Sequence, residues 1–141
     1  MARKEFQLEI VTPERIVYSD KVVSITAQAE DGRLGILHDH RPLVTKLQIA
    51  PFSFITQEGQ EENVAISGSG YLEVTPQKVT VLCQTAELSH EIELERAQEA
   101  KERAEERLQA SDEAIDYSRA EASLKRAIAR IDAARAQRND D

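Results

Sequence analysis

The amino-acid composition changes abruptly near residue 88, and this change constrains the fold more than any other feature of the chain. All five glycines, all four prolines and every valine lie before that point. Twelve alanines and many charged residues come after it. Valine favours strands, whereas alanine, glutamate and arginine favour helices. The sequence therefore predicts a β-domain over residues 1–88 and a helical domain over residues 89–141.

Short runs of alternating apolar residues occupy the first part of the chain. Alternation with a period of two is typical of strands that bury one face. Turn-forming residues separate the runs, as at residues 12–13, 31–32 and 75–76. The alternating apolar positions are Phe6, Leu8 and Ile10; Val23, Ile25 and Ala27; Phe52 and Phe54; Val64 and Ile66; Leu72 and Val74; and Val79 and Val81. Many short strands at this spacing predict an antiparallel β-sandwich or a flattened barrel.

The second part of the chain has the pattern of two helices. The first is expected over about residues 91–109, with Ser89 as its N-cap. The second is expected from about residue 112, or one turn later, to about residue 138, with apolar residues every three or four positions. Residues 111–113 break the pattern between them. A link this short predicts an antiparallel helical hairpin.

The apolar stripes of these two helices consist mostly of alanine. Burial contributes about 25 cal/mol per Å² of apolar area, so an alanine seam stabilises far less than a leucine seam. Such a hairpin has a high helix propensity but a weak tertiary contact. Two interpretations follow: the hairpin undocks and refolds as a switch, or it stays docked with its remaining surface in water.

The overall charge excludes two classes of partner. The formal net charge is -8 with a pI near 5.0, so the chain is expected to be repelled by nucleic acids and by anionic lipid surfaces. No stretch approaches the roughly 18 apolar residues that cross a bilayer, and no signal peptide is recognised. We therefore expect a soluble protein that reaches a membrane only through partners. Cys83, which alternates with apolar residues, is expected to be a buried and inert thiol.

The sequence contains no recognisable catalytic or metal-binding constellation. It lacks a P-loop, a GxGxxG motif and a CxxC motif. His38 and His40 flank Asp39, but two histidines without a third ligand nearby are a weak metal signal, and loop histidines in water are the favoured interpretation. The chain is therefore predicted not to be an enzyme on its own and to need no metal.

Four arginines of the helical part are more informative. Arg96 and Arg103 are seven residues apart, so they share one face of the first helix, and Arg126 and Arg130 share one face of the second. The second pair has no acidic residue three or four positions away on either side. Its countercharge is expected from another part of the fold, from an acidic partner or from a phosphate; the alternative is an exposed pair in water.

Several stretches resemble the epsilon subunits of bacterial ATP synthases. Residues 32–44 (GRLGILHDHRPLV) are similar to the family's GELGILPGHAPLV, and residues 67–74 (SGSGYLEV), followed by VTVL at 79–82, are similar to SGGFLEV…VTVL. Residues 11–13, with Tyr18 and Val23, resemble the opening strands of the family, and residues 115–120 (IDYSRA) resemble its second helix. The likeness extends over nearly the whole chain.

This resemblance implies a fold, partners and a location. It implies a sandwich of about ten strands that docks on the gamma subunit and the c-ring of a rotor coupling proton flow to rotation, at the cytoplasmic face of the bacterial cell membrane. It also implies that the hairpin extends into the catalytic hexamer, meets an acidic loop of the β subunit and inhibits ATP hydrolysis. The basic residues at the matching positions are Arg119, Lys125, Arg126 and Arg130.

In some similar subunits the folded hairpin binds ATP as a regulatory ligand through an I(L)DxxRA motif and further charged residues. The matching positions here are Ile92, Glu93, Arg96 and Ala97, with Glu87, Arg103, Arg126 and Arg130. Glu93 replaces the family's aspartate, and imperfect hydrogen-bond geometry is expected to weaken ATP binding roughly three- to tenfold.

Further departures fall in the loop that the resemblance predicts to face the c-ring. Arg33 stands where the family commonly has glutamate, His38 and Asp39 replace Pro-Gly, and His40 follows them. Two other function classes stay open from the sequence: a free-standing nucleotide sensor, and an adaptor that presents a helical hairpin to one partner.

Overall fold

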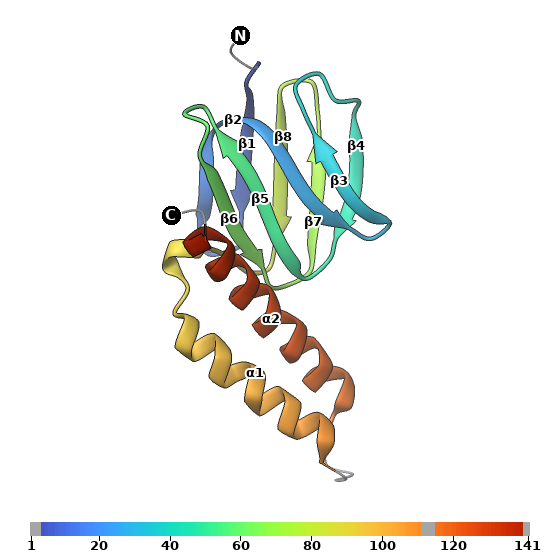
Figure 1. Ribbon diagram of the computed structural model, residues 1–141. Helices are drawn as coiled ribbons and strands as arrows, with labels where there is room; N and C mark the ends of the chain where they lie inside the picture. Colours follow the sequence, from blue (N-terminus) through green and yellow to red (C-terminus); the bar gives the residue numbers. More distant parts are fainter. Residues whose placement is uncertain (1–3, 111–114, 140–141) are drawn as a thin grey trace.

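Nine β-strands precede two α-helices in the part of the chain that the computed structural model describes, residues 4–110 and 115–139 (Figure 1). The predicted link at residues 111–113 lies outside the described residues. The strands are β1 (Phe6–Val11), β2 (Ile16–Ala29), β3 (Gly32–Ile36), β4 (Leu43–Leu47), β5 (Ala50–Thr56), β6 (Glu61–Ile66), β7 (Gly70–Val74), β8 (Lys78–Cys83) and β9 (Ala86–Leu88). A 3₁₀ turn η1 (Ser89–Glu91), α1 (Leu94–Gln109) and α2 (Tyr117–Asn139) follow.

The strands form one continuous sheet folded into two layers, in the order β1-β8-β7-β4-β2-β5-β6-β9, with β3 also paired to β2. All pairings are antiparallel except the parallel one between β1 and β8. The described residues contain nine strands where the resemblance implied about ten. The number of strands is lower because β2 is one long strand of 14 residues. Its first half pairs with β1 and its second half pairs with β3 and β5.

Most of the apolar residues predicted from the alternation fill the space between the layers; Val23 is buried outside this core, in which Val22 stands instead, next to a register shift in β2. Leu8, Ile10, Ile25, Phe52 and Phe54 are each at most 1% exposed. The same core includes Ala27, Val64, Ile66, Leu72, Val74, Val79, Val81 and Cys83. Burial raises the pKa of the Cys83 thiol to about 11, which keeps it protonated and unreactive at neutral pH. The predicted β-sandwich is confirmed.

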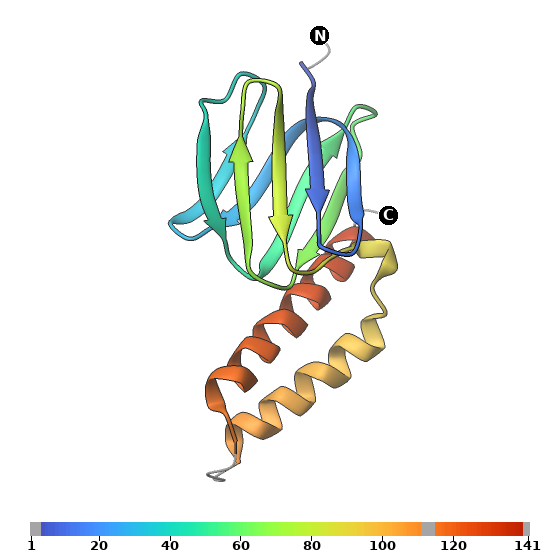
Figure 2. The same cartoon turned by 180° about the vertical axis from the view of Figure 1, so that it is seen from behind.

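The two helices run antiparallel and extend from one end of the sandwich (Figures 1 and 2). The C-terminal part of α2 lies against β5 and β6, whereas α1 packs mainly on α2. A second buried cluster joins the hairpin to the sheet, and its members are Ala65, Ile92, Ala97, Ile131, Ala133 and Ala134. Four of these six residues are alanines, as the sequence predicted for the seam.

The start of the first helix differs from the prediction. Ser89 is not the N-cap of α1, because residues 89–91 form the separate turn η1 and Ile92 and Glu93 are extended. The chain leaves the helical path here because the Ile92 side chain is buried in the hairpin cluster. At the other helix, the Asp116 carboxylate accepts a hydrogen bond from the Arg119 amide at 3.1 Å, which caps α2.

Candidate functional site

A cavity of about 550 Å³ lies between the end of the sandwich and the helical hairpin. Strand ends and turns of the sandwich form one wall, and the facing sides of α1 and α2 form the others. Pockets of this volume accommodate small-molecule ligands. The polar residues that line it include Thr12, Glu14, Arg15, Ser67, Gln84, Thr85, Glu87, Arg103, Arg107, Ser123, Arg126 and Arg130.

Five arginines face this cavity, although the chain as a whole is acidic. Arg103 and Arg107 are one helical turn apart on α1, and Arg126 and Arg130 have the same spacing on α2. Arg15 comes from the turn between β1 and β2. Among the described residues that line the cavity, two are carboxylates and five are arginines, so this lining has an excess of positive charge. This charge favours a phosphate-rich anion as its ligand.

The arginines differ in whether the fold neutralises them. Arg130 forms an ion pair with Glu87, in which Nε lies 2.8 Å from Oε1 and a terminal nitrogen donates to Oε2 at 3.3 Å. Arg126 donates to the Ser123 hydroxyl at 2.9 Å. Among the described residues, neither Arg126, Arg103 nor Arg107 has a carboxylate within ion-pairing distance. Three guanidinium groups are therefore available to an anion.

The structure divides the predicted nucleotide site into two groups. Glu87, Arg103, Arg126 and Arg130 line the cavity. The four residues of the matched motif do not line it, namely Ile92, Glu93, Arg96 and Ala97. Ile92 and Ala97 are buried in the hairpin cluster. Glu93 and Arg96 lie at the start of α1, with their carboxylate oxygen and guanidinium nitrogen 3.8 Å apart. The side chains of Glu93 and Arg96 are 68% and 76% exposed.

Two lining arginines were not predicted from the sequence. Arg107 follows Arg103 by four residues, so extending the spacing argument by one turn would have found it. No sequence signal points to Arg15, because its place depends on how the β1–β2 turn packs against the hinge of the hairpin.

Replacement of Glu93 by Asp tests the role of this position. We expect MgATP affinity to change by less than about twofold, because the carboxylate lies outside the cavity. Glu93 is the N-cap of α1 and makes no side-chain capping hydrogen bond, whereas Asp caps well, so the melting temperature should rise slightly. Isothermal titration calorimetry and thermal melting of both chains give the two readouts. An Asp variant that bound threefold or more tightly would place the carboxylate at the nucleotide, as the family resemblance implies.

A bidentate ion pair ties the hinge of the hairpin to the sandwich. The two terminal nitrogens of Arg15 donate to the two carboxylate oxygens of Glu91 at 2.9 and 2.8 Å. The hydrogen bonds from Arg15 lower the pKa of Glu91, and the same contact raises the pKa of Arg15. A carboxyl whose pKa falls on folding stabilises the fold above its ordinary pKa of 4.5, and this stabilisation is lost as the pH falls through the lower folded value.

The residues predicted to contact the β subunit occupy different environments. Arg119 and Lys125 are exposed on α2, and Arg119 borders a separate depression with Arg107. Arg126 and Arg130 instead face the cavity, so the folded hairpin holds them away from a partner.

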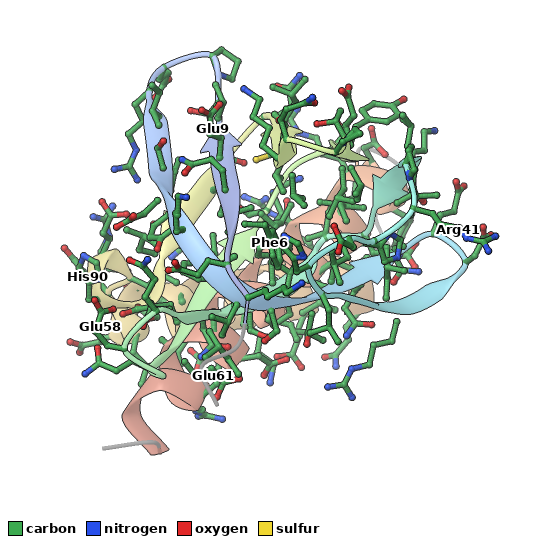
Figure 3. All side chains as sticks on the ribbon, turned by 90° about the horizontal axis from the view of Figure 1, so that it is seen from above. Phe6, Glu9, Arg41, Glu58, Glu61 and His90 are labelled. Carbon is green, nitrogen blue, oxygen red and sulfur yellow. The ribbon has the colours of Figure 1, made fainter. Side chains whose placement is uncertain are left out.

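The predicted c-ring loop is split by β3. Arg33 is the second residue of this strand, whereas residues 38–40 follow its other end, so the structure does not bring them together. The His38 ring nitrogen lies 3.1 Å from an Asp39 oxygen, and Asp39 has a φ of 63°. Arg41, the next residue along the chain, lies at the edge of the molecule in the view from above (Figure 3). The described residues contain no group of three or more His, Cys, Asp or Glu side chains placed to hold a metal ion.

Two family models match adjacent parts of the chain. One, described as the ATP synthase delta/epsilon chain β-sandwich domain, matches residues 5–89. The other, described as the ATP synthase delta/epsilon chain long α-helix domain, matches residues 90–137. The two matches meet between Ser89 and His90, close to the change in composition.

Relatives and solved structures agree with these matches. The ATP synthase epsilon chain of Bacillus licheniformis is 49% identical, over 94% of this chain and 99% of the relative. That of Syntrophomonas wolfei is 47% identical, over 93% and 95%. A chain from a cryo-EM structure of the Euglena gracilis mitochondrial ATP synthase has the same fold, with a TM-score of 0.79, 23% identity and coverage of 92% of this chain and 81% of that one. The chain belongs to the delta/epsilon family of ATP synthase chains.

Proposed function

We propose that this chain is the epsilon subunit in the central stalk of a bacterial proton-translocating ATP synthase, without a catalytic role of its own. In this proposal the β-sandwich docks on the gamma subunit and the c-ring, and the helical hairpin inhibits ATP hydrolysis by reaching a β subunit of the catalytic hexamer. Among the described residues no helix has the length and hydropathy to cross a bilayer. We place the subunit peripherally, at the cytoplasmic face of the membrane.

The observation that carries the regulatory part is a cavity whose walls come from both domains. Sandwich residues such as Ser67 and Thr85 lie opposite Arg103 and Arg126 of the hairpin. The cavity therefore exists only while the hairpin is folded against the sandwich. A ligand that binds only the folded position of the hairpin shifts the equilibrium from the extended towards the folded position. ATP bound in the cavity would thus hold the hairpin folded and relieve inhibition.

The charges of the cavity support a triphosphate as this ligand. Arg103, Arg107 and Arg126 have no carboxylate partner among the described residues, and guanidinium groups bind phosphate oxygens through paired hydrogen bonds. Glu87 is tied to Arg130 at 2.8 Å, so its carboxylate adds little repulsion. We infer that the phosphates lie among these three arginines, which have no carboxylate partner in the described part of the chain.

The contact that must break for the hairpin to extend is rich in alanine. Alanines make up most of the cluster between α2 and β6, and alanine buries less area than any larger aliphatic residue. An exchange between folded and extended hairpins within a few kcal/mol is consistent with such a contact. Arg119 and Lys125 would then supply the first basic contacts to the acidic loop.

Reconstitution tests this function. We expect the purified chain to co-elute with a gamma-containing catalytic hexamer that lacks its own epsilon subunit, and to lower its rate of ATP hydrolysis. Raising MgATP should partly restore the rate, because the nucleotide stabilises the folded hairpin. An isolated chain that bound MgATP but never joined the complex would instead be a free-standing nucleotide sensor.

A further inference from the structure

The turn η1 is the point where the sandwich ends and the hairpin begins, and it is held from two sides. The Glu91 carboxylate accepts two hydrogen bonds from Arg15, at 2.9 and 2.8 Å. It also accepts one from the Leu88 amide, at 3.0 Å. The two hydrogen bonds from Arg15 fix η1 against the β1–β2 turn, although Arg15 and Glu91 are 76 residues apart in sequence, and the bond from Leu88 orients the carboxylate within its own segment.

The two residues after η1 have the geometry of a pivot. Ile92 and Glu93 are extended, with ψ angles of 124° and 103°, and they separate η1 from the first turn of α1. Ile92 is 5% exposed because its side chain enters the cluster that joins the hairpin to β6. The position of η1 therefore determines whether Ile92 reaches that cluster.

We propose that Arg15 and Glu91 form a latch that holds the hairpin in its folded position, with Ile92 and Glu93 as the pivot about which it opens. The proposal rests on the proposed function in one respect, namely that the hairpin leaves the sandwich. The new element is that Arg15, a residue of the sandwich, determines what fraction of the molecules has an undocked hairpin.

The latch has a large relative effect because the apolar contact it reinforces is weak. The hairpin cluster is built mainly from alanine, so little apolar contact opposes the departure of the hairpin from the sandwich. Breaking a bidentate pair whose side chains are 45% and 31% exposed is expected to raise the undocked population roughly three- to tenfold. Solvent screening of the half-exposed arginine keeps the expected change within this range.

Thiol labelling of the full chain measures undocking directly. Ala65 is 0% exposed and packs on hairpin residues, so a cysteine introduced by Ala65→Cys reacts with a maleimide only when the hairpin has left. The native Cys83 lies in the sandwich core with its pKa raised to about 11, so its labelling reports opening of the sandwich itself. The ratio of the two rates separates hairpin undocking from unfolding.

Arg15→Gln and Glu91→Gln should each accelerate labelling at position 65 roughly three- to tenfold and leave labelling of Cys83 unchanged. The double variant should be no faster than either single variant, because the contact is already lost. Glu9→Gln is the matched control, since it breaks the Lys78–Glu9 pair of 3.2 Å, which lies within the sandwich. Equal labelling rates in all variants would overturn the latch.

A second measurement keeps the proposal testable if the added cysteine itself perturbs docking. The Ile92 amide donates to the Ser89 carbonyl at 3.2 Å, so its hydrogen exchange reports the opening of η1 in chains without the new cysteine. Faster exchange in Arg15→Gln supports the latch, and unchanged exchange contradicts it. If position 65 stays protected in every variant, including at high temperature below unfolding, the hairpin does not undock and the proposed regulatory function fails instead.

Discussion

A chain that ends at Leu88 should fold into a stable β-sandwich, bind no MgATP and no longer inhibit ATP hydrolysis. The main core draws all of its buried residues from positions 8–86, so the truncation removes none of them. It does remove Arg103, Arg107 and Arg126, and with them two walls of the cavity. Nucleotide binding is therefore expected to be lost completely.

Circular dichroism and calorimetric titration with MgATP test this expectation, together with the hydrolysis rate of the reconstituted complex. The truncated chain should still co-elute with the gamma-containing hexamer and support coupled synthesis. Loss of Ile131 and its neighbours exposes Ala65, so we expect a modest fall in the melting temperature. A truncated chain that failed to fold would show that the two domains form one cooperative unit and would refute the detachable hairpin.

Replacing Arg103 and Arg126 together by Gln should weaken MgATP binding at least roughly hundredfold, because each free guanidinium contributes a charge-assisted hydrogen bond of about 1.5–3 kcal/mol. Helix content should stay the same, since glutamine is a good helix former and neither arginine is paired with a carboxylate among the described residues.

The control for this prediction is Arg135→Gln, an exposed arginine of α2 that does not line the cavity. It removes one positive charge from the same helix, so any change it causes measures the long-range effect of net charge. We expect that change to be less than about twofold at physiological salt. Equal losses in the control and in the double variant would mean that the cavity arginines do not contact the phosphates.

Replacing Arg126 and Arg130 together would be less informative, although their spacing makes them the obvious pair to test. Arg130 neutralises Glu87, so its removal leaves a carboxylate without its partner on the cavity wall. Weaker binding in such a variant would mix the loss of a contact with a new repulsion. Arg103 and Arg126 avoid this ambiguity.

The spacing of apolar residues along the sequence predicted the fold, because it shows which face of each strand or helix is buried. The alternation at Phe52 and Phe54 requires one buried face, and the break in composition near residue 88 separates strands from helices. Helical spacing likewise placed Arg126 and Arg130 on one side of α2. These properties depend only on neighbours in the sequence.

Contacts between distant segments could not be predicted in this way. The sequence left the countercharge of Arg130 open, and the fold supplies it from Glu87, 43 residues away. The start of α1 was misplaced because Ile92 is buried in the hairpin cluster and η1 is tied to Arg15, and no local pattern predicts either contact. The separation of Glu93 from the cavity also depends on how α1 is rotated about its axis once docked.

The long strand β2 has a mechanical consequence for the rotor subunit proposed above. Its 14 residues are hydrogen-bonded to β1 at one end and to β3 and β5 at the other, so one unbroken segment of backbone belongs to both layers. If one layer slid over the other, the backbone hydrogen bonds between β2 and its neighbouring strands would have to break together and not one after another. In the proposed central-stalk role, the sandwich would therefore resist shear between its layers, and the two extended residues at the base of the hairpin would take up the movement of the helices.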